Sequence, residues 1–361
     1  MPDFPLWQTA EAQRWPAPRA WDWYNARPWL VGTNFIPSNA VNQLEMWQAE
    51  TFDPETIDRE LGWLAALGMN SMRVFLHDLP WLHDAPGFLA RIDQFLAIAQ
   101  RHGIGIMPVF FDSCWHPFPH LGKQRAPEPG VHNSGWVQSP GRIALLNENE
   151  WPRLEDYVRG VIRHFRTDPR VQVWDIWNEP DNNNAPHYGG RDLPGDEKAT
   201  RVLPLLARAF GWARAENPAQ PLTSAVWTGP WHDDDALPPL QKLQLHASDL
   251  ISFHRYQPLA GTRASAELLQ REHNRPLLCT EYLARSQGST FQEILPWFAQ
   301  QKIAAYNWGA VAGKTQTLHP WSTWQAPDRT EPIPWHHEIL RPTGEPYDPA
   351  ETELIRSLTK S

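Results

Sequence analysis

Short runs of β-branched and aromatic residues recur along the chain, and a stretch with helical apolar spacing follows nearly every one. The runs predict strands near residues 30–36, 70–76, 104–111, 171–178, 221–227, 249–256, 276–281 and 303–309. The helical stretches predict helices near residues 55–67, 88–102, 150–166, 199–215, 262–273, 290–301 and 350–358, and one with undefined ends within 236–247. Strands that alternate with helices in this way predict an α/β fold with a closed parallel (β/α)8 barrel, a TIM barrel.

Residues at the predicted boundaries support this pattern. Asp53-Pro54 combines a helix N-cap with a first-turn proline, and Gly68 follows the last apolar residues of the same helix. The alternative architecture, a doubly wound open sheet, would favour a glycine-rich phosphate loop after the first strand. The residues there are Gly32-Thr33-Asn34, which do not make such a loop.

The pattern divides the chain into a lead-in, residues 1–29, and a catalytic barrel, residues 30–361. The lead-in is predicted to be irregular and packed on the barrel, because its tryptophans would be costly to expose to water. These are Trp7, Trp15, Trp21, Trp23 and Trp29. The loops 112–149, 181–198 and 310–346 are long and follow strands three, four and eight. In such barrels the loops after the strands build the active site, so we expect long loops on the C-terminal face to shape it.

Composition narrows the classes of function. Of the 361 residues 41% are hydrophobic and 20% are charged, which allows a large core. The formal net charge of −9 argues against a nucleic-acid partner, which would need a basic face. There are 21 tryptophans, and we expect most of them to fill the core and the others to line a site where sugar rings stack.

The first residues, Met1-Pro2-Asp3-Phe4-Pro5, lack the basic start and apolar stretch of a secretory signal. No apolar run approaches the length of a membrane span, and the two cysteines, Cys114 and Cys279, give no disulfide framework. We therefore expect a cytoplasmic protein without a membrane partner.

Two carboxyl groups fall at the ends of predicted strands. The segment Trp174-Asp175-Ile176-Trp177-Asn178-Glu179-Pro180 places Glu179 at the end of strand four, and Leu278-Cys279-Thr280-Glu281-Tyr282 places Glu281 at the end of strand seven. In a parallel barrel these strand ends lie on one face. Cleavage of a glycosidic bond needs two carboxyl groups, one protonated to assist the leaving oxygen and one ionised. The pair therefore indicates a glycosidase.

With these segments the chain resembles the clan A glycoside hydrolases over residues 29–309, and among them the cellulase-like family 5 most. The resemblance implies a retaining enzyme without a cofactor that acts on β-linked oligosaccharides or glycosides. It implies Glu179 as the acid/base and Glu281 as the nucleophile, and retaining enzymes hold such carboxyl groups about 5–5.5 Å apart.

Five further residues match positions of the family motif. Arg73 matches the strand-two arginine that holds the nucleophile, and Asn178 matches the asparagine that binds the sugar 2-hydroxyl. His254 and Tyr256 match the His-x-Tyr pair on strand six, where the tyrosine hydroxyl donates to the nucleophile. Trp308 matches the strand-eight tryptophan under the sugar ring at the cleavage point. The resemblance thus implies a substrate-binding role for each.

One position departs from the family pattern. Family 5 enzymes usually carry a histidine at the end of strand three, whereas this strand ends Val109-Phe110-Phe111-Asp112. We expect Asp112 or His116 to take its place. The departure leaves the sugar and the linkage open.

Three other polar or aromatic residues are candidates for sugar contacts. Trp47 and Glu45 lie in the loop 39–48 after strand one, where Trp47 could stack on a ring and Glu45 could accept from hydroxyls. A packed loop with solvated polar groups explains them equally well. His77 follows strand two and could face the site.

Two alternatives would use the same residues. A transglycosylase shares every one of them, and a barrel that binds sugars without catalysis would have no reason to retain both glutamates. A metal-dependent hydrolase is a third alternative, but no segment matches a metal-binding pattern, so we expect no metal. The segments considered are Asp112, Cys114, His116 and His120; His232-Asp233-Asp234-Asp235; and His336-His337-Glu338. A cytoplasmic glycosidase would meet imported oligosaccharides, so we expect exo action or a preference for short chains. The oligomeric state stays open.

Overall fold

The computed structural model describes residues 13–188, 190–229, 231–232 and 236–360. Eight strands run parallel in the order β5-β4-β3-β2-β1-β8-β7-β6, and a bridge between Val226 and Phe253 joins the two ends of this sheet. They are β1 (Val31–Asn34), β2 (Ser71–Phe75), β3 (Gly105–Asp112), β4 (Trp174–Asn178), β5 (Leu222–Thr223), β6 (Ile251–His254), β7 (Leu277–Tyr282) and β8 (Ala304–Asn307). The predicted (β/α)8 barrel is confirmed.

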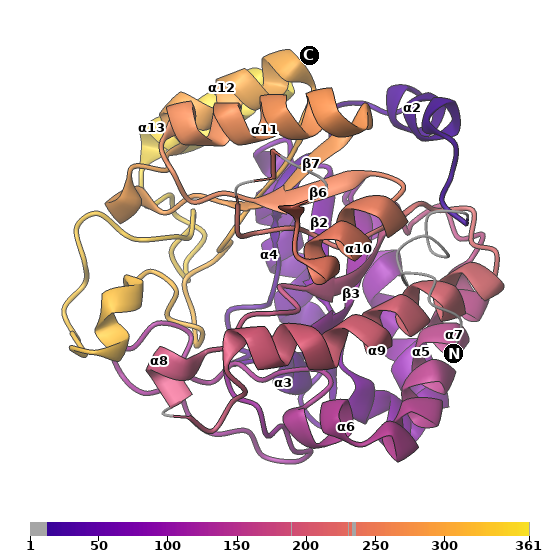
Figure 1. The fold of residues 1–361 in the computed structure, drawn as a ribbon. Coiled ribbons are helices and arrows are strands. Elements are labelled where there is room, and N and C mark those ends of the chain that lie inside the picture. Colours follow the sequence, from indigo (N-terminus) through magenta and orange to yellow (C-terminus); the bar gives the residue numbers. More distant parts are fainter. Residues whose placement is uncertain (1–12, 189, 230, 233–235, 361) are drawn as a thin grey trace.

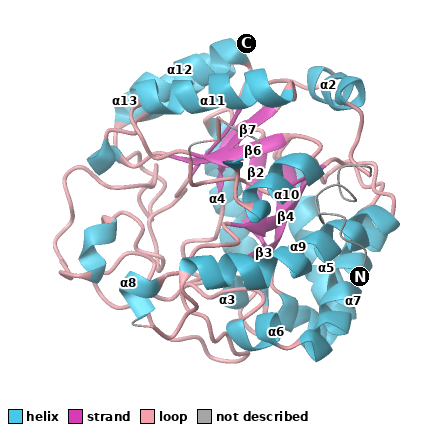
Figure 2. Cartoon of the chain, viewed as in Figure 1, coloured by secondary structure: helices cyan, strands magenta, loops and turns pink. Residues whose placement is uncertain are grey.

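Helices surround the strands (Figures 1 and 2). The longer ones are α4 (Pro54–Ala66), α5 (Asp78–Arg101), α7 (Trp151–Phe165), α9 (Gly195–Ala215), α10 (Pro239–Ala247), α11 (Leu259–His273), α12 (Phe291–Gln301) and α13 (Pro349–Thr359). In α7, Leu154, Val158, Val161 and Phe165 recur at helical spacing and are buried against the barrel. None of the helices in the described part of the chain combines the length and the apolar character that crossing a membrane requires.

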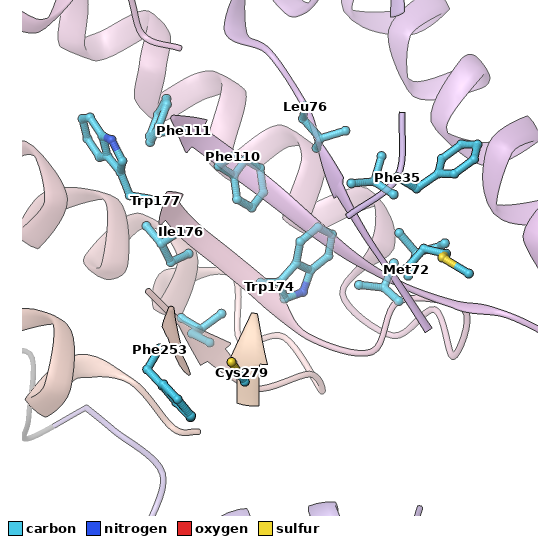
Figure 3. Close-up of a cluster of buried hydrophobic side chains, with 14 of the residues drawn as sticks. Phe35, Met72, Leu76, Phe110, Phe111, Trp174, Ile176, Trp177, Phe253 and Cys279 are labelled. Atoms are coloured by element: carbon cyan, nitrogen blue, oxygen red, sulfur yellow. The ribbon is translucent and has the colours of Figure 1, made fainter. Parts of the chain in front are cut away.

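The main core lies between the strands and the helices. Trp174 and Ile176 of β4 belong to this core, whereas Asp175 between them reaches Arg73 inside the barrel, as the pleat of a strand dictates. Trp174 stacks on Phe110, with ring centroids 5.4 Å apart (Figure 3). Packing on both faces of the strands fixes the position of each strand, and therefore the positions of the side chains at its end.

The lead-in is partly helical, which corrects the prediction of an irregular segment. Residues 1–12, with Trp7, lie outside the described part, but α2 spans Ala17–Asn25 and begins beside Pro16. Ala20 and Tyr24, one turn apart, are buried against inward-facing strand residues such as Met107. A helix of 9 residues is too short for its period to stand out among prolines and tryptophans.

Several other boundaries differ from the sequence prediction. β5 has 2 residues instead of the span 221–227, because its pairing with β4 ends at Thr223 and beyond it only Val226 forms an isolated bridge, to Phe253 of β6. α5 consists of two helical segments that meet at a kink at Asp84, whose φ of −153° and ψ of 75° are not helical. The predicted helix near 88–102 corresponds to the second segment, and the prediction missed the first, which begins at Asp78 and contains Pro80. The loops also contain three short helices, α3 (Gln43–Trp47), α6 (Arg142–Leu146) and α8 (Ala185–Tyr188).

Candidate active site

Glu179 and Glu281 reach the same space at the C-terminal ends of the strands. Nδ1 of His254 lies 2.8 Å from Oε1 of Glu179 and 3.6 Å from Oε2 of Glu281. One ligand atom of each of the three residues lies within 4.8 Å of the others. The β6–β7 register shifts between Phe253 and His254, and this shift sets His254 opposite Glu281. The strand-end geometry therefore brings two carboxyl groups and one imidazole together.

The backbone at Glu179 has an uncommon conformation. Its φ is +42°, in the left-handed region, directly after β4 and before Pro180. A residue before proline disfavours helical conformations, and a non-glycine residue with positive φ stores strain of order 1–3 kcal/mol. The turn re-aims the Glu179 side chain at the end of the strand, so that it faces His254.

Glu281 is held by a cation and a hydroxyl. Nη1 of Arg73 donates to its Oε1 at 2.9 Å, and the Tyr256 hydroxyl donates to its Oε2 at 2.7 Å. Arg73 is itself fixed within the barrel, since it donates to Asp175 at 2.9 Å and to Asn178 at 2.8 Å. Arg73 is fully buried, so its charge acts on Glu281 with little screening by water.

Glu179 has neutral partners instead. Nδ2 of Asn182 donates to Glu179 Oε2 at 2.8 Å, and the Cys114 thiol donates to the same oxygen at 3.3 Å. Sequence reasoning missed both donors as contacts of the glutamate. Asn182 stands three residues after Glu179, a spacing that could have suggested it, whereas Cys114 comes from a different loop and has no such signal.

These surroundings set different protonation preferences. Burial raises the pKa of Glu179, and burial also raises the pKa of Glu281, where the nearby Glu179 adds to the effect. Two close carboxyl groups in a buried site do not both ionise readily, so one proton is shared between them. Arg73 and Tyr256 favour the charged form of Glu281, which leaves the proton on Glu179.

The thiol and the imidazole in this site are both neutral. Burial lowers the pKa of His254 to about 3, so that its ring carries no charge near neutral pH. Burial raises the pKa of the Cys114 thiol, with the nearby Asp112 carboxylate adding to the effect. Cys114 therefore faces Glu179 as a hydrogen-bond donor.

Neither residue expected to replace the strand-three histidine reaches the glutamates. Asp112 is buried and accepts from Nδ2 of Asn178 at 2.9 Å and from Nε1 of Trp136 at 2.6 Å. His116 packs against Tyr188, with ring centroids 5.3 Å apart. Asp112 thus orients Asn178 from behind, and the residue that contacts Glu179 from this loop is Cys114.

A pocket of about 390 Å³ opens above the two glutamates. Its lining includes Asn178, Tyr256 and Trp308 of the predicted site. Trp308 packs edge-on against Phe75, with ring centroids 5.7 Å apart, so its position is fixed by the barrel. The other lining residues are Cys114, Trp115, His132, Asn133, Glu179, Asn182, Asn183, Asn184, His187, Trp227, Glu281, Trp321 and His337.

Of the residues predicted to bind substrate, Arg73, His254 and Asp112 do not line this pocket, and neither do the three further candidates for sugar contacts. Trp47 is buried, donates to the Phe75 carbonyl at 2.7 Å and packs among core phenylalanines. Glu45 accepts from the backbone of Val41 and pairs with Lys314 at 2.7 Å. His77 is fully buried and caps α5. The structure brings none of the three to the pocket, because Trp47 packs in the core, His77 caps a helix and Glu45 is held in an ion pair.

Among the described residues, one group of three side chains could hold a metal ion: Glu179, His254 and Glu281. This group coincides with the two candidate catalytic glutamates. The segments weighed from the sequence do not come together in this way, and of the acidic turn after His232, Asp233–Asp235 lie outside the described residues.

Solved structures share the fold. GH5_18 from Streptomyces cattleya, in a complex with Manβ1-4GlcNAc, is 15% identical over 91% of this chain and 80% of its own, with a TM-score of 0.60. The exo-β-1,4-mannosidase Op5Man5 from an Opitutaceae bacterium is 19% identical over 92% of this chain and 60% of its own, with a TM-score of 0.59. The β-1,4-mannanase of Aplysia kurodai is 16% identical over 78% of this chain and 88% of its own, with a TM-score of 0.54.

No protein-family model and no curated protein matches the chain. The likeness to the family 5 fold, which the Asn-Glu-Pro segment and its partners on other strands suggested, is confirmed at the level of three-dimensional structure.

Proposed function

We propose that the chain is a retaining β-glycosidase, with Glu179 as acid/base and Glu281 as nucleophile. One observation carries the proposal: two carboxyl groups share a buried pocket but have unlike partners. A cation and a tyrosine hold Glu281, whereas an amide, a thiol and the neutral imidazole of His254 hold Glu179. The unlike partners separate the pKa values of the two groups, which is what an acid and a nucleophile need.

The reaction takes place in two displacements. In the first, an oxygen of Glu281 bonds to the anomeric carbon, the bond to the leaving oxygen breaks, and that oxygen takes the proton of Glu179. In the second, Glu179 takes a proton from water while the water oxygen bonds to the same carbon and the bond to Glu281 breaks. Each displacement inverts the carbon, so the product keeps the configuration of the substrate.

β-Mannosides are the first substrates to test. The similar structures described above include a mannanase, a mannosidase and a complex with Manβ1-4GlcNAc. Mannose differs from glucose in its axial 2-hydroxyl. Asn178, which the resemblance assigns to that hydroxyl, lies on the pocket and is locked by Arg73 and Asp112, so it can distinguish the two orientations.

The test uses aryl β-mannosides, β-glucosides and β-galactosides with good leaving groups. Glu281→Ala is expected to lose turnover on all of them, because no covalent intermediate can form. Glu179→Ala is expected to keep the first step and slow in the second, and added azide, which needs no base, restores turnover and gives the β-glycosyl azide. Loss of acid assistance is expected to cost about 10²–10⁴-fold on poor leaving groups. Product analysis by NMR reads out each case.

The control is Glu353→Ala, which removes an exposed carboxylate on α13 and should leave turnover unchanged. A β-azide from Glu281→Ala and no azide effect on Glu179→Ala would reverse the two roles. Wild-type turnover in both variants would place the chemistry elsewhere.

A further inference from the structure

Three long loops meet on one side of the pocket. Trp115 and His132 come from the loop after β3, His187 from α8 after β4, and Trp321, Trp324 and His337 from the loop after β8. We call these six residues the closing wall. Figure 1 shows α8 beside the yellow segment that follows β8. All of them except Trp324 line the pocket.

Trp324 joins the three loops. Its ring stacks on Trp115, with centroids 5.2 Å apart and planes 13° from parallel. It also contacts His187 at 4.7 Å and Tyr188 at 5.3 Å between centroids. A single side chain therefore packs against both of the other loops, and its loss would remove this shared contact, although Trp115 and His187 also pack on each other directly, with ring centroids 4.8 Å apart.

Hydrogen bonds of backbone and side-chain groups join the β3 loop to the β8 loop. The amide of Asn133 donates to the Thr315 carbonyl at 2.8 Å, and the amide of His132 donates to the Thr323 hydroxyl at 3.0 Å. Nδ1 of His132 lies 2.8 Å from the His319 carbonyl. His132 is buried, so these bonds are shielded from water. The wall is a fixed part of the protein.

Arg285 fixes the other end of the β8 loop. Its guanidinium donates to the carbonyl of His337 at 2.6 Å and to that of Glu338 at 2.9 Å. The same group pairs with Glu351 of α13 at 2.5 Å. The loop is thus tied to a helix outside the barrel mouth as well as to the β3 loop. A substrate that displaced the loop would have to break these hydrogen bonds.

Trp321 and His337 of the wall lie next to the partner of Glu281. Tyr256, which donates to Glu281, contacts Trp321 at 5.1 Å and His337 at 5.5 Å between ring centroids. The leaving group departs past Glu179. Beyond Glu179 lies Asp181, which accepts from the indole of Trp227, a half-buried residue that follows β5. Both the wall and Trp227 line the pocket. With Glu281 as nucleophile and Glu179 as acid, the proposed reaction places the attacked sugar next to Trp321 and His337 and the leaving group next to Trp227.

We infer that the closing wall restricts the enzyme to exo action, removing one sugar at a time from the non-reducing end. The inference rests on the proposed glycosidase function and names its mode of action. An internal unit of a chain would need space for another sugar where Trp321, His132 and His337 stand. A terminal sugar instead presents free hydroxyls to this wall.

The two histidines of the wall that face the pocket suit such hydroxyls. Burial lowers the pKa of His132 to about 3 and the pKa of His337 well below its usual value. Each ring has its Nδ1 engaged by a backbone carbonyl, His132 by His319 and His337 by Leu283. With a proton on Nδ1, Nε2 of each ring is an acceptor, so the wall accepts hydrogen bonds from a terminal sugar.

The test follows products from a β-1,4-mannotetraose labelled at its reducing end. The wild-type enzyme is expected to release mannose alone at early times, with labelled trisaccharide appearing before disaccharide. Trp324→Ala is expected to release mannobiose or larger unlabelled fragments as well, because the three loops lose their common contact. Trp63→Ala, which removes an indole beside Gly344 away from the pocket, should keep the wild-type pattern.

The wild-type products decide the question even if Trp324→Ala fails to fold, which its melting curve would reveal. Unlabelled mannobiose or mannotriose from the wild-type enzyme at early times would overturn exo action while leaving the glycosidase proposal intact. Failure to cleave the tetrasaccharide and every aryl glycoside would overturn both. A folded Trp324→Ala with only mannose as product would show that the wall does not set the mode of action.

Discussion

At the scale of single residues, hydrogen-bond donors distinguish two chemically identical carboxyl groups. Both glutamates are buried and both have raised pKa values, so burial alone assigns no role. The hydrogen-bond partners distinguish the two groups, because a guanidinium stabilises an anion far more than an amide or a thiol does. The roles that we propose for the acid and the nucleophile therefore depend on side chains from β2, from the segment after β6 and from the loops after β3 and β4.

The donor on the acid can be tested by its effect on pH dependence. The Asn182 amide lowers the pKa of Glu179, and Asn182→Ala removes this effect. The pKa of Glu179 then rises, and the alkaline limb of kcat/KM on an aryl glycoside is expected to move to higher pH. Asn149→Ala, at an exposed position, should leave the limb in place. A limb that stays fixed or moves to lower pH would contradict the assignment of Glu179 as the acid.

At the scale of elements, a lysine that forms a buried ion pair within the segment after β4 also anchors this segment to the loop after β3. Lys198 of α9 and Asp192 lie 2.7 Å apart, and both are almost fully buried. Nζ of Lys198 also donates to the carbonyls of Ser113 and Asn182, at 3.0 and 2.5 Å. The segment that carries Asn182 is therefore anchored to the loop that carries Cys114, and both donors reach Glu179 together.

Removing one member of this pair leaves an uncompensated buried charge. Lys198→Ala is expected to lower the free energy of unfolding by about 3–5 kcal/mol. Chemical denaturation measures it, with Lys123→Ala, at an exposed position, as the control. Asp192→Ala combined with Lys198→Ala should cost less than the sum of the single changes. Additive losses would mean that the two groups do not act as a pair.

At the scale of the whole molecule, the β8 loop places a carboxyl group in the interior. Glu338 is fully buried behind Trp308, and burial raises its pKa to about 7. Its Oε1 accepts from the Thr317 hydroxyl at 2.8 Å, while Oε2 has no hydrogen-bond partner among the described residues. A group of this kind makes the stability of the protein depend on pH.

The direction in which stability changes with pH follows from proton binding. Between the usual pKa of Glu338, 4.5, and about 7, the folded protein holds a proton on this group that the unfolded chain has lost. Stability therefore falls as pH rises through this window, by on the order of 3 kcal/mol in total. Glu338→Gln should remove this part of the fall, and Glu353→Gln should not. Urea unfolding at several pH values gives both curves, and parallel curves for wild type and Glu338→Gln would refute the shift.

The sequence by itself determined the barrel and the central part of the site. The regular spacing of apolar residues in a strand or a helix is a local property, so the sequence shows it wherever an element is long enough. The ends of parallel strands converge on one face, so Glu179, Glu281, Arg73 and Tyr256 could be placed together before any contact was known. Where an element was short or contained prolines, as in β5, α2 and the start of α5, the spacing of apolar residues did not predict its bounds.

The tertiary structure alone decided what surrounds that centre. The sequence could not show that Trp47 turns into the core, that Cys114 faces Glu179, or that Trp324 joins three loops. The position of a strand residue follows from its own strand and the barrel. The position of a loop residue follows from hydrogen bonds and packing with segments that are distant in the sequence, as between His132 and His319, 187 residues apart, and no local pattern in the sequence encodes those contacts.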